Sequence, residues 1–104
     1  MSRSNIFDFA IFNGQLLPVN EAKVSIFNQA FFSSFGVYES IKVDQGRPFY
    51  LMDHLCRLLE SAQEIELELD ITIDTLAEWF NLLVGVDPAA TWSLKIIVLG
   101  NTEP

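Results

Sequence analysis

The spacing of hydrophobic residues changes once along this chain, at Leu51. Before Leu51 the apolar residues alternate with polar ones or form short runs bounded by turn signals, as strands do. From Leu51 onward they recur at helical spacing, at Leu51, Leu55, Leu58, Leu59 and Ala62. Such spacing is typical of a helix with one apolar face. We therefore expect strands first and helices after them.

Two turn signals divide the first half of the chain into hairpins. Asn13-Gly14 lies between short apolar runs and is a strong signal for a tight hairpin turn. Asp44-Gln45-Gly46 indicates a second hairpin, and Pro48 follows its turn. Between the two hairpins, residues 21–29 predict an edge strand or an extended piece.

The second half of the chain predicts two helices and a closing strand. The first helix is expected from about Met52 to about Leu67. The second lies within residues 72–86, with Thr72 or Asp74 as its N-cap and Gly85 at its end. Its expected apolar face consists of Leu76, Phe80, Leu83 and Val84. A strand over residues 91–100 completes an α+β fold, a mainly antiparallel sheet with two helices packed on one face.

Composition narrows the classes of partner. Fourteen acidic residues against six basic ones give a formal net charge of −8, which argues against nucleic acid or an anionic membrane surface. The single cysteine, Cys56, excludes an internal disulfide and is expected to be a small buried residue in a reducing compartment. No Cys/His cluster predicts a metal site, and no signal peptide or membrane-spanning run is apparent. We expect a soluble cytoplasmic protein.

His54 and Arg57 form the first candidate site. They are the only histidine and one of three arginines, and they lie three positions apart near the start of the first predicted helix. That spacing puts both on one side of the helix, where the helix dipole and the arginine fork favour an anion such as phosphate. The alternative is that Arg57 pairs with Asp53 or Glu60, and spacing alone favours that pairing. His54 alone is more often a structural histidine than a catalyst.

The strand over residues 37–43 separates two sets of side chains. One face carries Val37, Glu39, Ile41 and Val43, and the other carries Tyr38, Ser40 and Lys42. The second face is either the floor of a polar pocket or a solvated face, and alternation alone favours the solvated face. Glu39 stands among apolar neighbours, so if it is buried it needs a hydrogen-bonding partner.

Two further groups have a structural and a functional interpretation. Lys23, Lys42 and Lys95 are the amines available for covalent catalysis, but nothing around them in the sequence distinguishes them from surface lysines. Aromatic residues are dense between Phe27 and Tyr38, at Phe27, Phe31, Phe32, Phe35 and Tyr38. This cluster is either local core or an interface with a second subunit or domain.

The order of these motifs resembles a known family. The segments "NGQLLPVNEAKVSIFNQAFF" and "GVYESIKVDQGRPFYLMDHLCRLLESAQEIEL" resemble the N-terminal small domain of the class IV aminotransferases, which are fold-type IV pyridoxal-phosphate enzymes. The family includes branched-chain and D-amino acid aminotransferases and aminodeoxychorismate lyase. The resemblance runs from about Phe7 to about Gly100.

The resemblance implies a cofactor, partners and site residues. The cofactor would be pyridoxal 5'-phosphate, with Arg57 of the H-L-x-R-L motif on its phosphate and His54 nearby in a supporting role. Tyr38 of the G-V-[FY]-E motif would help position the substrate, and Ser40 would line the same pocket. The partners would be an amino acid, a 2-oxo acid and a second copy of the chain in a homodimer.

The chain also departs from the family pattern. Asn28-Gln29-Ala30 replaces the Asp-Arg-Gly often found before the strand, and "SSFG" replaces the usual turn. The family's Schiff-base lysine belongs to a C-terminal domain that would begin beyond Pro104, and none of the three lysines matches it.

We therefore expect residues 1–104 to be the small domain of an amino acid aminotransferase of the branched-chain or D-amino acid type, inactive alone. The alternatives are an aminodeoxychorismate lyase-type enzyme or a non-catalytic binding or dimerisation module.

Overall fold

The N-terminal part of the structure is a two-stranded hairpin. The computed structural model describes residues 6–25 and 36–100. In the first range, β1 (Phe9–Phe12) pairs antiparallel with β2 (Gln15–Pro18). The turn residues Asn13 and Gly14 have φ of 50° and 86°, and a two-residue turn with both φ values positive matches the twist of the strands. The first predicted hairpin is confirmed.

The described segment after this hairpin, residues 19–25, forms no strand. A 3-10 turn, η1 (Val19–Glu21), follows β2, and residues 22–25 belong to no strand. Ala22 has an extended backbone, with φ −83° and ψ 93°. Of the two predictions for residues 21–29, the edge strand is therefore not formed over residues 21–25, and the extended piece agrees with the backbone of Ala22. Residues 26–29 lie outside the described part.

The central sheet has three antiparallel strands in the order β4-β3-β5. β3 (Gly36–Asp44) runs along β5 (Trp92–Leu99), while β4 (Arg47–Pro48) pairs only with the last two residues of β3. Gln45 and Gly46 turn between β3 and β4 with φ of 49° and 79°, as the second predicted hairpin requires. Within the described chain, no strand lies beside the β4-side edge of β3 from Gly36 to Ile41.

Helix α2 (Leu51–Glu64) starts after Tyr50, whose backbone is left-handed with φ 56°. It ends in a Schellman motif, in which the Leu67 N–H donates to the Ala62 carbonyl at 2.8 Å and the Glu66 N–H donates to the Gln63 carbonyl at 3.0 Å. Glu66 takes the left-handed position of this motif, with φ 59°. The helix therefore stops three residues before the predicted Leu67.

Helix α3 (Ile73–Val84) has the predicted N-cap. The Thr72 side-chain oxygen accepts a hydrogen bond from the Thr75 backbone N–H at 3.2 Å. Asp74, the other candidate cap, lies inside the first turn, where its negative charge favours the helix dipole. Gly85 caps the C-terminal end, as expected.

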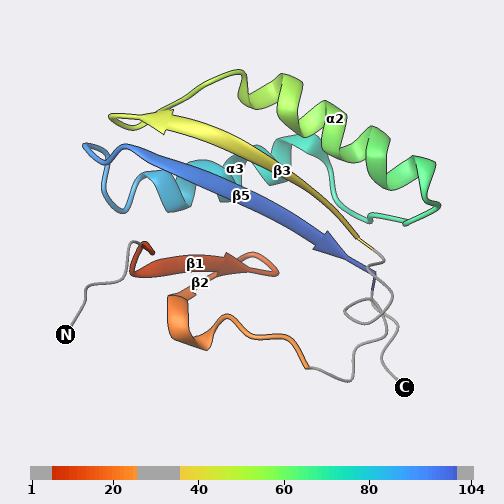
Figure 1. The fold of residues 1–104 in the computed structure, drawn as a ribbon, viewed down its shortest axis with the longest axis horizontal. Helices are drawn as coiled ribbons and strands as arrows, with labels where there is room; N and C mark the ends of the chain where they lie inside the picture. The colour runs from red at the N-terminus through yellow and green to blue at the C-terminus, as the bar shows by residue number, and fades with distance from the viewer. Residues whose placement is uncertain (1–5, 26–35, 101–104) are drawn as a thin grey trace.

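Both helices pack on one face of the central sheet, which confirms the predicted α+β architecture. Figure 1 shows β3 and β5 side by side, α2 along β3, and the hairpin of β1 and β2 below β5. The core lies between the layers, and each fully buried aliphatic side chain in it stabilises the fold by roughly 1.5–3 kcal/mol. Its buried side chains come from β3, α2 and α3 and form two clusters: Ile41, Val43 and Phe80, and Leu55, Leu58 and Leu76.

The hairpin of β1 and β2 is joined to this core through aromatic side chains. Gly14 lies against the indole of Trp79 on α3, and a Cβ added at Gly14 would be 2.7 Å from a ring carbon. Phe7, just before β1, meets Trp92 of β5 edge-on, with ring centroids 5.2 Å apart. Glycine at position 14 therefore allows both the left-handed backbone of the turn and the close approach of Trp79 on α3.

One sequence-based expectation about α2 is wrong. Cys56 is exposed, because it lies one position beyond the buried Leu55 and outside the apolar stripe of the helix. Neither helix in residues 6–25 and 36–100 has the length and hydropathy needed to cross a bilayer.

Candidate functional site

Three side chains from β3 and α2 form a connected polar cluster on the helix side of the sheet. Glu39 Oε1 lies 2.6 Å from His54 Nδ1, and the Arg57 guanidinium donates to both carboxylate oxygens. Arg57 Nε is 3.1 Å from Oε2 and Nη2 is 2.9 Å from Oε1, so the carboxylate is held along the side edge of the guanidinium. This bidentate geometry is the strong form of an arginine–carboxylate pair.

The contact between His54 and Glu39 fixes the histidine tautomer. An ionised carboxylate only accepts hydrogen bonds, so at 2.6 Å the His54 Nδ1 must carry the proton and donate it. Arg57 Nη2 lies 3.2 Å from the same nitrogen. Since that nitrogen carries a proton, this second contact is a close approach of two donors and not a hydrogen bond. Glu39 therefore accepts hydrogen bonds from both His54 and Arg57.

Burial and charge act on Glu39 in opposite directions. Its side chain is only 12% exposed, while His54 is 20% and Arg57 is 65% exposed. The hydrogen bond from Arg57 is the largest effect on the Glu39 pKa and lowers it, and the hydrogen bond from His54 lowers it further against the opposing effect of burial. The same hydrogen bond raises the pKa of Arg57. The carboxylate is thus held in its ionised form.

The sequence predicted the two halves of this cluster separately. His54 and Arg57 do address one site, and Glu39 does have hydrogen-bonding partners. The predicted ion-pair partners of Arg57, Asp53 and Glu60, are wrong, because the carboxylate paired with Arg57 is that of Glu39 on the neighbouring strand. Glu39 is largely shielded from water and needs donors, whereas Asp53 and Glu60 are exposed.

The cluster retains donors that fit a phosphate group. Glu39 engages Nε and Nη2 of Arg57, and Nη1 has no hydrogen-bond partner among the described residues. That end of the guanidinium belongs to a side chain that is 65% exposed. A guanidinium fork held on one edge and free at the other suits a planar or tetrahedral oxyanion. Arg57, with His54 behind it, is therefore a chemically suitable set for the phosphate of a cofactor.

Tyr38 and Ser40 lie on the opposite face of β3 from this cluster. Tyr38 is 63% exposed, and Ser40 is also exposed. The structure thus does not bring the two predicted substrate residues together with His54 and Arg57. Both sets nevertheless flank the edge of β3 that has no neighbouring strand between Gly36 and Ile41 in the described chain.

Lys95, which the sequence does not distinguish from a surface lysine, lies beside Tyr38 on this second face. Its Nζ lies 5.0 Å from the centroid of the Tyr38 ring, within the range of a cation–π interaction. Lys95 on β5 is also directly opposite Ser40 in the strand register. Nothing in the sequence marks this lysine, because its place beside Tyr38 depends on the pairing of two strands 55 positions apart.

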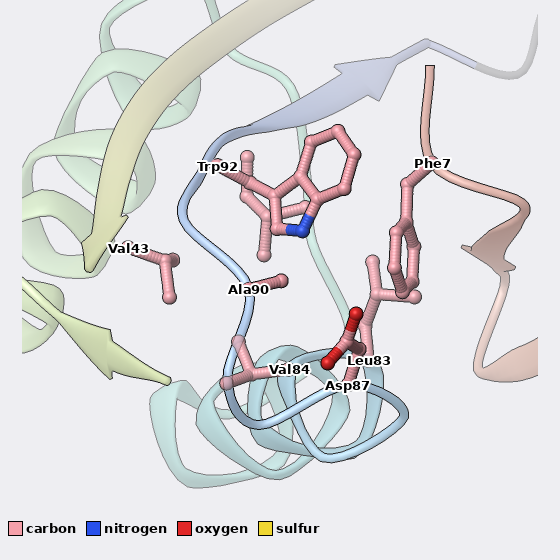
Figure 2. A pocket seen from close by; sticks show the side chains of 8 residues that line it. Phe7, Val43, Leu83, Val84, Asp87, Ala90 and Trp92 are labelled. Atoms are coloured by element: carbon pink, nitrogen blue, oxygen red, sulfur yellow. The ribbon is translucent and has the colours of Figure 1, made fainter. Parts of the chain in front are cut away.

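A small cavity, partly open to solvent, lies away from both candidate groups. Figure 2 shows the side chains around it, which come from the segment before β1, from β3, from α3 and the loop that follows it, and from β5. Its volume is about 10 Å³, room for roughly one water molecule, and its walls are largely apolar. Trp92 Nε1 is buried there and has no hydrogen-bond partner among the described residues. This cavity is too small for a cofactor or substrate.

Two other groups considered in the sequence, the aromatic cluster and a possible metal site, contribute no candidate site among the described residues. Phe27, Phe31, Phe32 and Phe35 lie outside the described residues. Within residues 6–25 and 36–100, no group of three or more His, Cys, Asp or Glu side chains is arranged to hold a metal ion.

Comparison with known proteins decides the family. The family model for amino-transferase class IV matches residues 36–104, which include β3, α2, α3 and β5. The chain is a member of the class IV aminotransferase family. Among curated class IV relatives, D-alanine aminotransferase of Staphylococcus aureus strain N315 is 34% identical over 84 residues, covering 81% of this chain and 30% of that protein. The chain thus spans about a third of the length of such relatives.

Solved class IV structures share the fold. Branched-chain amino acid aminotransferase of Escherichia coli superposes with a TM-score of 0.83 at 22% identity, over 91% of this chain and 33% of that one. The branched-chain aminotransferase of Thermoproteus uzoniensis, solved with norvaline, superposes with a TM-score of 0.67 at 30% identity, over 82% of this chain and 30% of that one. The α+β arrangement predicted from the sequence is therefore that of the class IV fold.

Proposed function

We propose that the protein is a pyridoxal-phosphate-dependent aminotransferase that exchanges an amino group between an amino acid and a 2-oxo acid. The chain's membership of the class IV family supports this reaction class. The observation that carries the proposal is the Arg57 guanidinium, which Glu39 holds along one edge and whose other edge has no hydrogen-bond partner among the described residues.

In this proposal residues 1–104 are a small domain that contributes part of the active site. Arg57 holds the cofactor phosphate and His54 supports it from the same helix. Tyr38 and Ser40 contribute to the substrate pocket from the other face of β3. The related proteins named above act on D-alanine or on branched-chain amino acids, and either class is a candidate substrate.

Pyridoxal phosphate, when bound, supplies the electron sink for chemistry at the substrate's α-carbon. The residues of this chain bind, orient and shield, and we place the lysine that binds the cofactor covalently in a domain beyond these residues. The cytoplasmic location expected from the sequence stays a prediction.

The test of this function is the effect of Arg57→Ala on cofactor affinity. Arg57→Ala removes a charge-assisted contact to the phosphate, and this loss should weaken pyridoxal-phosphate binding about 10- to 150-fold. Fluorescence titration of the natural full-length apoprotein with the cofactor measures this. Arg47→Ala, which removes an exposed arginine from β4, is the matched control and should leave the affinity unchanged.

An unchanged affinity for pyridoxal phosphate in Arg57→Ala, together with a large loss of thermal stability, would contradict the proposal. Arg57 would then be a structural ion-pair partner of Glu39 and nothing more.

We also propose that the protein is a homodimer whose contact includes Phe31, Phe32 or Phe35. The chain is 50% hydrophobic, and apolar surface favours association at roughly 25 cal/mol per Å² before the entropy of association is subtracted. The net charge of −8 opposes association, so added salt should tighten the dimer by screening that repulsion. Sedimentation velocity at low and moderate salt measures both effects. A monomer at micromolar concentration under both conditions would show that the dimer proposal is wrong.

A further inference from the structure

Glu39 accepts hydrogen bonds from both members of the candidate phosphate site. Its carboxylate accepts from Arg57 Nε and Nη2 at 3.1 and 2.9 Å and from His54 Nδ1 at 2.6 Å. It comes from a different element, since Glu39 is on β3 and the other two residues are on α2. The Glu39 carboxylate on β3, the middle strand of the sheet, thus holds the His54 and Arg57 side chains of α2 in place.

The rigidity of the two partners differs sharply. Glu39 is 12% exposed and its strand is fixed by β5, whereas Arg57 is 65% exposed on a long, flexible side chain. An exposed arginine samples many rotamers, and immobilising such a side chain on binding a ligand reduces affinity. The contact with Glu39 holds Arg57 in one orientation before any ligand arrives.

The geometry of the contact leaves the useful edge open. Glu39 occupies the side edge of the guanidinium, formed by Nε and Nη2, and Nη1 at the far end has no partner among the described residues. Had the carboxylate taken the end edge instead, Nη1 would be engaged and an oxyanion would have to displace it. The observed arrangement therefore lets one arginine hold a carboxylate and a phosphate at the same time.

We propose that Glu39 is a positioning residue for cofactor-phosphate binding, acting through Arg57 and, by fixing the Nδ1–H tautomer, through His54. This inference rests on the proposed function, because it takes Arg57 to be the phosphate ligand. Glu39 itself does not touch the phosphate, since two carboxylate oxygens already accept from Arg57 and His54.

The negative charge of Glu39 opposes this effect. A carboxylate near a phosphate repels it, so its removal strengthens binding electrostatically. In the cluster that charge is compensated by Arg57, and the guanidinium lies in contact with solvent, where salt screens the remaining repulsion. Measurement at about 0.5 M salt suppresses the repulsion further and leaves the positioning effect.

The experiment compares affinities for pyridoxal phosphate and for pyridoxal, which lacks the phosphate, in the natural full-length apoprotein. The ratio of the two affinities isolates the contribution of the phosphate. Glu39→Gln should lower this ratio about 3- to 10-fold. Glu60→Gln, which removes an exposed carboxylate one turn beyond Arg57, is the matched control and should leave the ratio unchanged.

A double variant tests whether Glu39 acts through Arg57. If it does, Glu39→Gln has no further effect on the ratio once Arg57→Ala is present, because the residue that it positions is gone. Nitrogen-15 NMR of the apoprotein gives an independent readout. The Arg57 Nε–H and His54 Nδ1–H signals should be protected from exchange in the wild type and lost in Glu39→Gln.

The outcomes separate this inference from the proposed function. If Arg57→Ala lowers the ratio and Glu39→Gln does not, the positioning role is wrong and the phosphate site stands. If Arg57→Ala leaves the ratio unchanged, the phosphate site itself is wrong. If Glu39→Gln does not fold, Glu39→Asp serves instead, because it keeps the charge but withdraws the carboxylate from Arg57 by one methylene. A ratio that stays at the wild-type value in Glu39→Asp, with the Arg57 Nε–H signal lost, would also overturn the inference.

Discussion

At the scale of single residues, Glu39 combines a charge with an enclosed position. Its carboxylate lies on the face of β3 that otherwise carries Val37, Ile41 and Val43, beneath α2. Such a group is stable in its ionised form only while donors satisfy it. The same two contacts that serve the candidate site therefore also serve the fold.

This coupling makes the free energy of unfolding depend on pH through Glu39. The pKa of the folded carboxyl is lowered from its ordinary value of 4.5, first by Arg57 and then by His54. Stabilisation by a depressed carboxyl is present above the unfolded pKa and is lost as the pH falls through the folded pKa. The stability difference between wild type and Glu39→Gln should thus be constant above about pH 5.5 and shrink below about pH 4.5.

Chemical denaturation of both proteins at pH 3 to 7 measures this difference, which we expect to be of the order of 1–3 kcal/mol at neutral pH. Glu60→Gln, which removes an exposed carboxylate, should show little effect at any pH. A difference that stays the same down to about pH 3 would show that the Glu39 hydrogen bonds do not depend on its charge.

The sequence predicts both parts of this cluster but not their contact. Alternation places Glu39 on an apolar face and implies a buried polar group in need of donors. Helical spacing places His54 and Arg57 on one side of α2. Which helix residue meets which strand residue depends on how α2 lies across β3, and that packing is set by the whole apolar face and not by a local signal. Spacing alone favours a pairing of Arg57 with Asp53 or Glu60, because it ranks only residues that are neighbours in the sequence.

At the scale of elements, the end of α2 stores local backbone strain. Glu66 has a left-handed backbone at the position of the Schellman motif that glycine usually occupies. For a residue with a Cβ, this conformation costs roughly 1–2 kcal/mol. Since no glycine marks the position, the sequence predicted a helix that continued to Leu67. The two hydrogen bonds that close the motif nevertheless end it at Glu64.

Glu66→Gly should therefore stabilise the protein. Relief of the strained backbone is partly offset by the greater freedom of glycine in the unfolded chain, so we expect a net gain of up to about 1 kcal/mol. Urea denaturation of wild type and variant measures it. Glu66→Gln is the control, because it removes the same charge without relieving the backbone. An equal gain in Glu66→Gln would show that the effect comes from the charge of this acidic segment and not from the left-handed backbone.

At the scale of the whole molecule, the central sheet separates two chemically different sides. The helix side holds the core and the Glu39–His54–Arg57 cluster. The other side of β3 and β5, as far as the chain is described, carries exposed Tyr38, Lys42 and Lys95. The layers and the covered face could be predicted from hydrophobic spacing. The strand register, which puts Lys95 beside Tyr38, could not, because alternation fixes the face of a side chain and not its cross-strand neighbour.

This division leads to a prediction about residues 1–104 tested alone. Lys42 and Lys95 are exposed on the face of the sheet opposite Arg57, and Lys23 is exposed after η1. An amine that reacts with the cofactor must be shielded from water so that it loses its proton at neutral pH, and all three lysines are exposed. We therefore expect no 2-oxo acid release above that of free cofactor when this polypeptide is incubated with pyridoxal phosphate, D-alanine and 2-oxoglutarate. A coupled assay of pyruvate measures it. Release above that level, abolished by Lys42→Ala or Lys95→Ala, would mean that these residues contain their own reactive amine and that a second domain is not needed to supply it.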